Sequence, residues 1–229
     1  MLDVDGQKRI AARWAADQVS DGMLVGLGSG STATLAVQAL GVRVRQGLHL
    51  TGVATSTATE DLARSLGIRV LPLDESPQLD VAIDGADEVD PLLNLIKGLG
   101  GALLREKLVE LAAKNLTIIV DQGKPVPVLG SRCPVPVEIV PFGWRRTQAR
   151  IEELGCQAVL RLIQGEAFLT DSGHYVLDCR FGPLGDAEVL AGQLKALTGV
   201  VEHGLFLGLA TRVVVGLADG SVEVRLRQQ

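Results

Sequence analysis

Histidine and aromatic residues are scarce in this sequence. Its 229 residues include three histidines, two tryptophans, one tyrosine and four phenylalanines. So few aromatic rings provide little surface on which the bases of a single strand could stack. So few histidines argue against chemistry that needs clustered imidazoles. The net charge is −5 at pH 7. We therefore expect neither nucleic acid nor an anionic membrane as the main partner.

Cysteine is equally rare, and its spacing excludes two common uses. Cys133, Cys156 and Cys179 are odd in number, widely separated and form no C-x-x-C pair. Zinc binding uses close ligand pairs, and a disulfide framework normally uses an even number of cysteines. We expect three reduced cysteines, no metal and a cytoplasmic protein.

Long hydrophobic runs are also missing. The longest, Leu116–Val120 and Val213–Ala218, fall far short of the roughly 18–20 residues that cross a bilayer. The first residues are charged early and lack the apolar core of a signal peptide. These features favour a location in the cytoplasm without a membrane partner.

Glycine, by contrast, is abundant. The 27 glycines make up about 12% of the chain, against a usual ~7%. The length corresponds to one large domain or two unequal ones at about 150 residues per domain. A hydrophobic share of 47% and a charged share of 21% are ordinary for a globular protein.

The first half of the sequence alternates helical and strand patterns. Continuous apolar runs predict buried strands, and apolar residues at i, i+3 and i+4 predict the helices between them. This alternation indicates an α/β fold with a mostly parallel, Rossmann-like sheet flanked by helices. The expected strands are 23–27, 50–54, 68–71, 79–83 and 116–120, and the expected helices are 7–19, 31–40, 56–65 and 102–114.

The second half has a different pattern. Five prolines between positions 125 and 141 suit a crossing between domains. Helices at 145–154 and 186–197 then alternate with strands at 158–163 and 200–203 and a hairpin turning at 171–173. This β-α-β-β-α-β order predicts a smaller ferredoxin-like α+β domain. We expect it to span 130–205, with 1–129 and 206–229, including a terminal hairpin around Asp219-Gly220, forming the Rossmann-like domain.

Three motifs carry candidate chemistry, and the first is the glycine turn 26–32, Gly-Leu-Gly-Ser-Gly-Ser-Thr. It joins a predicted strand to a predicted helix, where bare backbone amides and the helix N-terminus can bind an anion. The sequence has no lysine before Ser31 for a Walker A loop and no third glycine for a dinucleotide fingerprint. The G-x-S-x-G elbow of esterases also fails, because Leu27 and Ser31 flank Ser29. A phosphate site and a plain tight turn with a Ser/Thr cap both remain open.

The second motif is the acidic turn 84–88, Asp-Gly-Ala-Asp-Glu, which follows a predicted strand. Ligands of open α/β sheets bind at the carboxyl ends of strands, and two nearby carboxylates can share one proton for acid/base work. A calcium loop would need Glu where Leu95 stands. A solvated acidic turn without function is the alternative.

The third motif is a second glycine loop, 97–101, that leads into a helix carrying Glu106. A carboxylate and the Lys97 ammonium lie on either side of a loop with exposed backbone amides. This arrangement suits the removal of a proton from a substrate carbon next to a carbonyl group. Glu106 would be the base, and Lys97 would hold the developing oxyanion. The alternative is that Glu106 belongs to an i, i+4 side-chain pair on a solvent-exposed (wet) face of the helix.

Together the three motifs, in this order and spacing, closely resemble ribose-5-phosphate isomerase of the A type. Asp121 with Lys124, and the stretch 140–143 (Val-Pro-Phe-Gly), also match. The similarity runs from about Lys8 to the terminal hairpin. The resemblance implies interconversion of D-ribose 5-phosphate and D-ribulose 5-phosphate in the non-oxidative pentose phosphate pathway, without metal or cofactor. It also favours a homodimer or a homotetramer.

The resemblance assigns roles to single positions. Glu106 matches the general base, Lys97 matches the group that stabilises the enediolate, and the acids of the second motif match groups that open the ring and move protons at the sugar oxygens. The other matches would bind the sugar phosphate. The implied catalytic residues are Glu106, Lys97, Asp84 and Asp87, and the implied substrate-binding residues are Lys8, Ser29, Gly30, Ser31, Thr32, Asp84, Gly85, Ala86, Asp87, Lys97, Gly98, Leu99, Gly100 and Lys124.

One position departs from the family pattern. Leu99 stands where the family often has glycine, and a branched side chain with positive φ would cost roughly 1 kcal/mol or more. We expect Leu99 to point away from the loop, with only the flanking glycines needing that freedom.

Two rival functions belong to other classes. A non-catalytic sugar-phosphate sensor of the DNA-binding kind would need a helix-turn-helix module, and about 25 residues before Gly26 cannot hold one. A coenzyme A transferase of similar architecture would be larger and would not need the phosphate turn.

Overall fold

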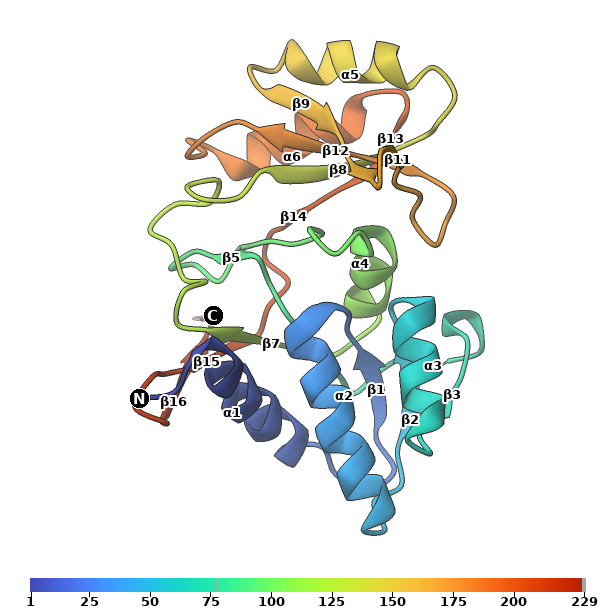
Figure 1. The fold of residues 1–229 in the computed structure, drawn as a ribbon, viewed down its shortest axis with the longest axis vertical. Helices are drawn as coiled ribbons and strands as arrows, with labels where there is room; N and C mark the ends of the chain where they lie inside the picture. The colour runs from blue at the N-terminus through green and yellow to red at the C-terminus, as the bar shows by residue number, and fades with distance from the viewer. Residues whose placement is uncertain (77, 228–229) are drawn as a thin grey trace. The chain divides into compact units, whose positions relative to one another are not determined.

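The computed structural model describes residues 1–76 and 78–227 and divides into two compact units (Figure 1). The first unit comprises 1–86, 105–124 and 209–229, and the second comprises 87–104 and 125–208. The predicted domain boundaries differ from these units at 87–104, 125–129 and 206–208. The reason is a small antiparallel sheet, in which β5 (Glu88–Val89) and β14 (Leu205–Phe206) both pair with β6 (Leu95–Ile96).

The first unit contains the expected mostly parallel sheet. Its seven strands run in the order β16-β15-β7-β4-β1-β2-β3, and only the edge pair β15–β16 is antiparallel. The Rossmann-like prediction and the terminal hairpin are therefore confirmed. The strands are β1 (Leu24–Leu27), β2 (Thr51–Ala54), β3 (Arg69–Val70), β4 (Val81–Asp84), β7 (Leu116–Asp121), β15 (Arg212–Gly216) and β16 (Val222–Leu226).

Helices cover both faces of this sheet. α1 (Val4–Asp17), α2 (Gly30–Arg45) and α3 (Thr57–Ser65) share one hydrophobic core with β1, β4, β7 and β15 (Figure 1). α1 faces this core with a stripe of alanines, whose small side chains let α2 pack closely. On the other face Val109 of α4 (Leu103–Leu111) packs with Val53 and Leu79. A short 3₁₀ helix, η1 (Leu73–Glu75), follows β3.

The second unit contains a four-stranded antiparallel sheet in the order β13-β8-β12-β9. With α5 (Trp144–Glu152) and α6 (Ala187–Ala196) it follows the β-α-β-β-α-β order, which confirms the ferredoxin-like prediction. Alternate residues of the central strands, Val137 and Leu177 among them, pack against Ile151 and Leu194 of the helices. The strands are β8 (Val135–Ile139), β9 (Gln157–Leu160), β12 (Tyr175–Arg180) and β13 (Val200–His203).

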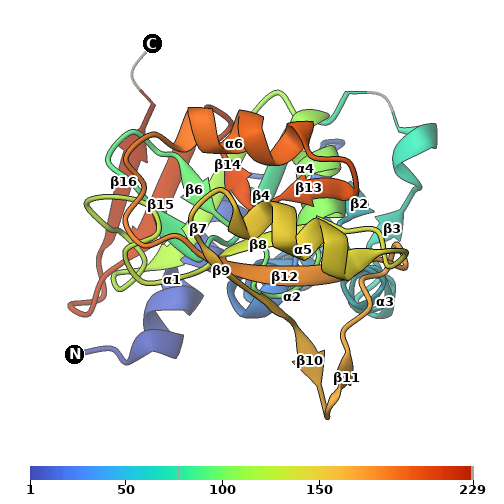
Figure 2. The same cartoon turned by 90° about the horizontal axis from the view of Figure 1, so that it is seen from above.

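A short hairpin interrupts the strand predicted at 158–163. β9 ends at Leu160, and β10 (Leu162–Ile163) pairs instead with β11 (Glu166–Ala167). The chain reverses through Gln164 and Gly165, both with positive φ, as a two-residue hairpin turn requires. Figure 2 shows this hairpin projecting beyond the four-stranded sheet, and the apolar side chains of Leu162 and Ile163 are exposed.

Candidate active site

The first glycine turn packs directly against the end of β4. The Gly28 amide donates to the Ile83 carbonyl at 3.0 Å, and the Ser29 amide donates to Asp84 Oδ1 at 3.1 Å. A Cβ on Gly28 would lie 2.2 Å from Asp84 Cγ, so only glycine fits there. Gly30 has φ +85°, which favours glycine as the residue that opens α2.

The Ser/Thr-cap interpretation of this turn is wrong. Ser29 is the N-cap residue of α2, yet its side chain makes no capping hydrogen bond among the described residues. Its hydroxyl lies 2.5 Å from Thr55 Oγ1 instead. The first amides of α2 thus lack a side-chain cap, as a helix end that receives an anion requires. Lys8 of α1 reaches the same turn, with its Nζ 3.2 Å from Ser31 Oγ.

The acidic motif is buried at its two ends, so it is not a solvated turn. Asp84 is 1% exposed, and its Oδ1 accepts from the Gly85 amide at 2.7 Å as well as from Ser29. Glu88 is also 1% exposed and accepts from the backbone amides of Gly130, Arg132 and Cys133 at 2.6–2.7 Å. Glu88 therefore holds the loop at 130–133, whereas Asp84 holds the first glycine turn.

The second glycine loop is held from both sides in the second unit. The Leu99 amide donates to Asp87 Oδ2 at 3.0 Å, which joins the second and third motifs. Arg161 Nη1 donates to the carbonyls of Gly98 and Leu99 at 2.9 and 3.0 Å, and the same guanidinium pairs with Asp178. Sequence reasoning missed Arg161, because nothing in the local pattern of β9 and β10 indicates a partner some sixty residues away.

The expectation for Leu99 is confirmed. Positive φ is carried by Gly98 (+104°) and Gly101 (+85°), and Leu99 is not among the positive-φ residues. Its side chain is 40% exposed. A Cβ on Gly101 would lie 2.3 Å from the ring of Phe168, so this glycine is required by packing as well as by conformation.

Lys97 and Glu106 are both buried despite their charges. Lys97 follows β6, is 2% exposed, and places its Nζ 5.3 Å from the ring centroid of Phe206. Glu106 lies in the first turn of α4 and is 5% exposed, so the wet-face interpretation is wrong. Buried ionisable groups are costly and concentrate at functional sites.

The predicted site residues fall into both units. In the first unit, β1 and β4 are parallel neighbours and β4 and β7 likewise, so their carboxyl ends share one edge of the sheet. The structure brings together at that edge the turn after β1, the end of β4 and the Lys124 turn after β7, where the Lys124 amide donates to the Asp121 carbonyl. Glu106 belongs to the first unit, and Asp87, Lys97, Gly98, Leu99 and Gly100 belong to the second.

Two features are absent from residues 1–76 and 78–227: a cluster of metal-binding side chains and a membrane-spanning helix. No group of three or more His, Cys, Asp or Glu side chains is arranged to hold a metal ion there. Within the same residues, every helix is too short or too polar to cross a bilayer.

Comparison with known proteins gives the family. Residues 51–220 match the sequence model described as ribose 5-phosphate isomerase A (phosphoriboisomerase A). The chain belongs to this family. Among ribose-5-phosphate isomerase A relatives, that of Synechococcus sp. (strain JA-3-3Ab) is 55% identical over 98% of this chain and 99% of its own length. That of Thermomicrobium roseum is 52% identical, covering 96% and 93%.

Solved structures of this isomerase family share the fold. A D-ribose-5-phosphate isomerase in complex with phospho-erythronic acid superposes with a TM-score of 0.95 at 36% identity, covering 99% of this chain and 100% of the other. The ribose 5-phosphate isomerase of Plasmodium falciparum gives 0.95 at 36% identity, covering 98% and 100%. That of Methanocaldococcus jannaschii gives 0.91 at 38% identity, covering 96% and 98%.

Proposed function

We propose that this chain interconverts D-ribose 5-phosphate and D-ribulose 5-phosphate through an enediolate, in the non-oxidative pentose phosphate pathway. The family membership over almost the whole chain carries this proposal. The anion-type turn at the carboxyl edge of the sheet agrees with a phosphorylated substrate. A structural relative in complex with phospho-erythronic acid, itself a phosphorylated sugar acid, points the same way.

In this proposal the turn after β1 holds the phosphate. Ser29, Gly30, Ser31 and Thr32 offer amides and hydroxyls at the uncapped start of α2, whose dipole favours an anion. The ammonium of Lys8, already beside Ser31, adds positive charge. Lys124, after β7, binds the substrate from the neighbouring strand.

The chemistry is assigned to carboxylates and lysine. Glu106 takes the proton from C2 of the open-chain aldose and returns it to C1, and the Lys97 ammonium stabilises the oxyanion of the enediolate. Asp84 and Asp87 open the sugar ring and move protons at its oxygens, while Gly85, Ala86 and the loop 98–100 bind the sugar. A positioned base supplies about 10²–10⁴-fold, so oxyanion stabilisation must supply much of the rest.

A direct assay tests the activity against the sensor alternative. Purified protein incubated with ribose 5-phosphate should form ribulose 5-phosphate, measured by a coupled assay. A sensor would bind the sugar phosphate, seen by calorimetry, without turning it over. Binding without product would therefore reject the enzyme and favour the sensor.

Replacing Gly28 with Ala should damage the site through a single methyl group. The new Cβ would meet Asp84 Cγ at 2.2 Å, and overpacking of this kind costs about 1–3 kcal/mol. If this strain displaces the Asp84 carboxylate from its place in the site, kcat/KM drops by about ten- to hundredfold. Gly192→Ala is the matched control, because nothing lies within 4 Å of its Cβ. Equal kinetics of the two variants would remove the proposed role of the Gly28–Asp84 contact.

Removal of metal ions should leave the activity intact. None of the proposed steps uses a metal, because Lys97 supplies the positive charge that the oxyanion needs. Activity is compared before and after exhaustive chelation, with the chelator removed by gel filtration. Loss of turnover that one divalent ion restores would contradict this mechanism.

We also propose a homodimer or a homotetramer located in the cytoplasm. The exposed apolar side chains of Leu162, Ile163 and Leu169 provide surface that association could bury. Light scattering should give two or four times the chain mass of 24.1 kDa, and a monomeric mass would contradict the proposal. Fractionation of the cells that make the protein tests its location.

A further inference from the structure

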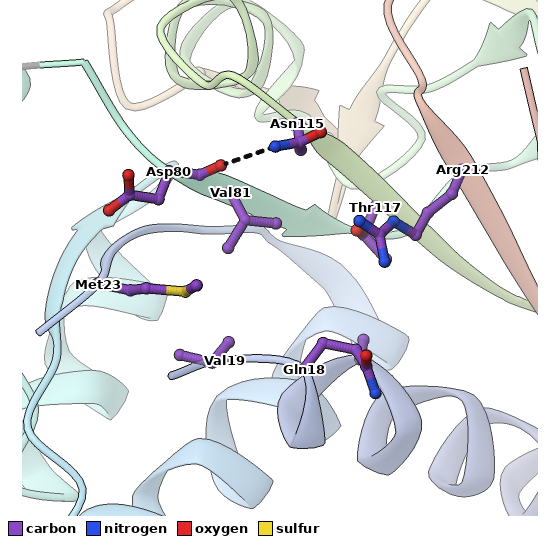
Figure 3. Close-up of a pocket in the computed structure, with 9 residues that line it drawn as sticks. Gln18, Val19, Met23, Asp80, Val81, Asn115, Thr117 and Arg212 are labelled. Atoms are coloured by element: carbon purple, nitrogen blue, oxygen red, sulfur yellow. Dashed lines mark hydrogen bonds between the residues drawn. The ribbon is translucent and has the colours of Figure 1, made fainter. Parts of the chain in front are cut away.

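A pocket lies in the first unit at the edge of the sheet opposite to the glycine turn. It opens at the amino ends of β1, β4, β7 and β15 (Figure 3). The turn at 28–32 and Asp84 lie at the carboxyl ends of β1 and β4. The cavity volume is about 90 Å³, and the pocket is open to solvent on one side. This is below the roughly 300–1,000 Å³ of sites for drug-sized ligands, so an occupant would have only a few heavy atoms.

The pocket lies at the C-terminal end of α1, beside the first residues of β7 and β15. Ile119 and Val214 lie in the core that α1 and α2 cover. Two residues earlier on the same strand faces, Thr117 and Arg212 are partners in the β7–β15 ladder. α1 ends at Asp17 and the chain then turns toward β1, so Ala15 is the one helical residue among the described residues that line the pocket.

Two polar side chains of the pocket wall lack partners. Within residues 1–76 and 78–227, the Arg212 guanidinium makes no ion pair or hydrogen bond, and neither does the Thr117 hydroxyl. Thr117 is 3% exposed as a residue, but its hydroxyl oxygen is not one of the fully buried polar atoms without a partner, so it reaches the open space of the pocket. Both groups are therefore available to a ligand that accepts hydrogen bonds.

The acidic side chain of the pocket is already satisfied. Asp80 accepts from the Leu24 amide and from Lys114 Nζ, both at 3.0 Å. These hydrogen bonds, the backbone one first, lower the pKa of its carboxyl, which is therefore ionised at neutral pH. Figure 3 shows Asp80 and Arg212 at opposite ends of the pocket, with Val81 between them.

We propose that this pocket binds a small monocarboxylate with a short alkyl body, separately from the substrate. The carboxylate would pair with the planar Arg212 fork and the Thr117 hydroxyl, and the alkyl part would lie against Val19, Met23 and Val81. A phosphate fits less well, because only one unpaired cation is present among the described lining residues and the Asp80 charge repels a dianion. The glycine turn that suits a phosphate is at the other edge.

Binding of sodium 3-methylbutanoate to the full chain tests this proposal. Saturation-transfer NMR titrations compare the wild type with Arg212→Met and Thr117→Val. Arg69→Met is the matched control, since Arg69 is exposed on β3 of the same sheet. The uncharged 3-methylbutanol and inorganic phosphate are titrated in parallel, and circular dichroism melts verify that each variant is folded.

We expect saturable, millimolar binding of 3-methylbutanoate to the wild type and Arg69→Met, as suits so small a ligand. Arg212→Met should bind at least about tenfold more weakly and Thr117→Val several-fold more weakly, while turnover of ribose 5-phosphate stays unchanged in both. Equal binding to Arg212→Met, or no saturable binding to the wild type, would overturn the site. Binding of the alcohol equal to that of the carboxylate, or loss of phosphate binding in Arg212→Met, would overturn the ligand class.

Discussion

Glu106→Gln should lower the turnover of ribose 5-phosphate by at least about 10²-fold while leaving substrate binding measurable. The amide is nearly isosteric with the carboxylate but cannot accept the C2 proton. Glu106 is 5% exposed in the first turn of α4, so the exchange removes one charge from a fixed position. The measurements are kcat and KM by coupled assay and the dissociation constant by calorimetry.

A buried carboxylate on the same helix provides the control for this variant. Glu110 lies one turn after Glu106 and is 4% exposed, so Glu110→Gln removes an equally buried charge. We expect Glu110→Gln to retain exchange of the C2 proton of the substrate with deuterated solvent and Glu106→Gln to lose it. If Glu106→Gln exchanges this proton at a near-native rate, Glu106 is not the base.

Lys97→Met should lower kcat by about 10²–10³-fold, the usual effect of removing one donor to an oxyanion. Methionine keeps the unbranched stem that packs near Phe206, and at a position 2% exposed it removes a buried cation without leaving a large cavity. The loss should therefore fall on kcat, with a smaller change in the melting temperature. In the proposed mechanism, the Lys97 ammonium stabilises the transition state more than it stabilises the bound substrate.

Lys195→Met is the control for the loss of a lysine. Lys195 lies on α6 with its side chain 55% exposed and pairs with Glu202, whose side chain is 12% exposed; it is not one of the proposed site residues. Its kinetics should match the wild type within experimental error. Native kcat in Lys97→Met would reduce Lys97 to a structural residue of the loop.

The order of elements could be predicted because each strand and helix of the first unit has its own local pattern. Continuous apolar runs such as Leu116–Val120 and the capping serine at position 56 are local signals, and Ser56 does accept from the Thr59 amide. The candidate site could be listed for the same reason, since its glycine and acidic motifs are contiguous.

Features that depend on distant partners could not be predicted. The hydrogen bonds of Arg161 to the 98–99 carbonyls, the pairing of β6 with β14 and the burial of Glu106 all depend on the tertiary fold. The hairpin β10–β11 has only two residues in each strand, which is too few to show an alternation of apolar and polar residues. The carboxylate pocket likewise depends on where α1 ends relative to the strands.

Leu99 has a backbone held by hydrogen bonds and a side chain that is partly exposed to solvent. Its amide is bound by Asp87 and its carbonyl by Arg161, while the side chain is 40% exposed. Position 99 is therefore a suitable attachment point for a spectroscopic label on the glycine loop 97–101. A dye or spin probe placed there would test whether sugar phosphate reaches this loop, without altering the glycines that shape the backbone.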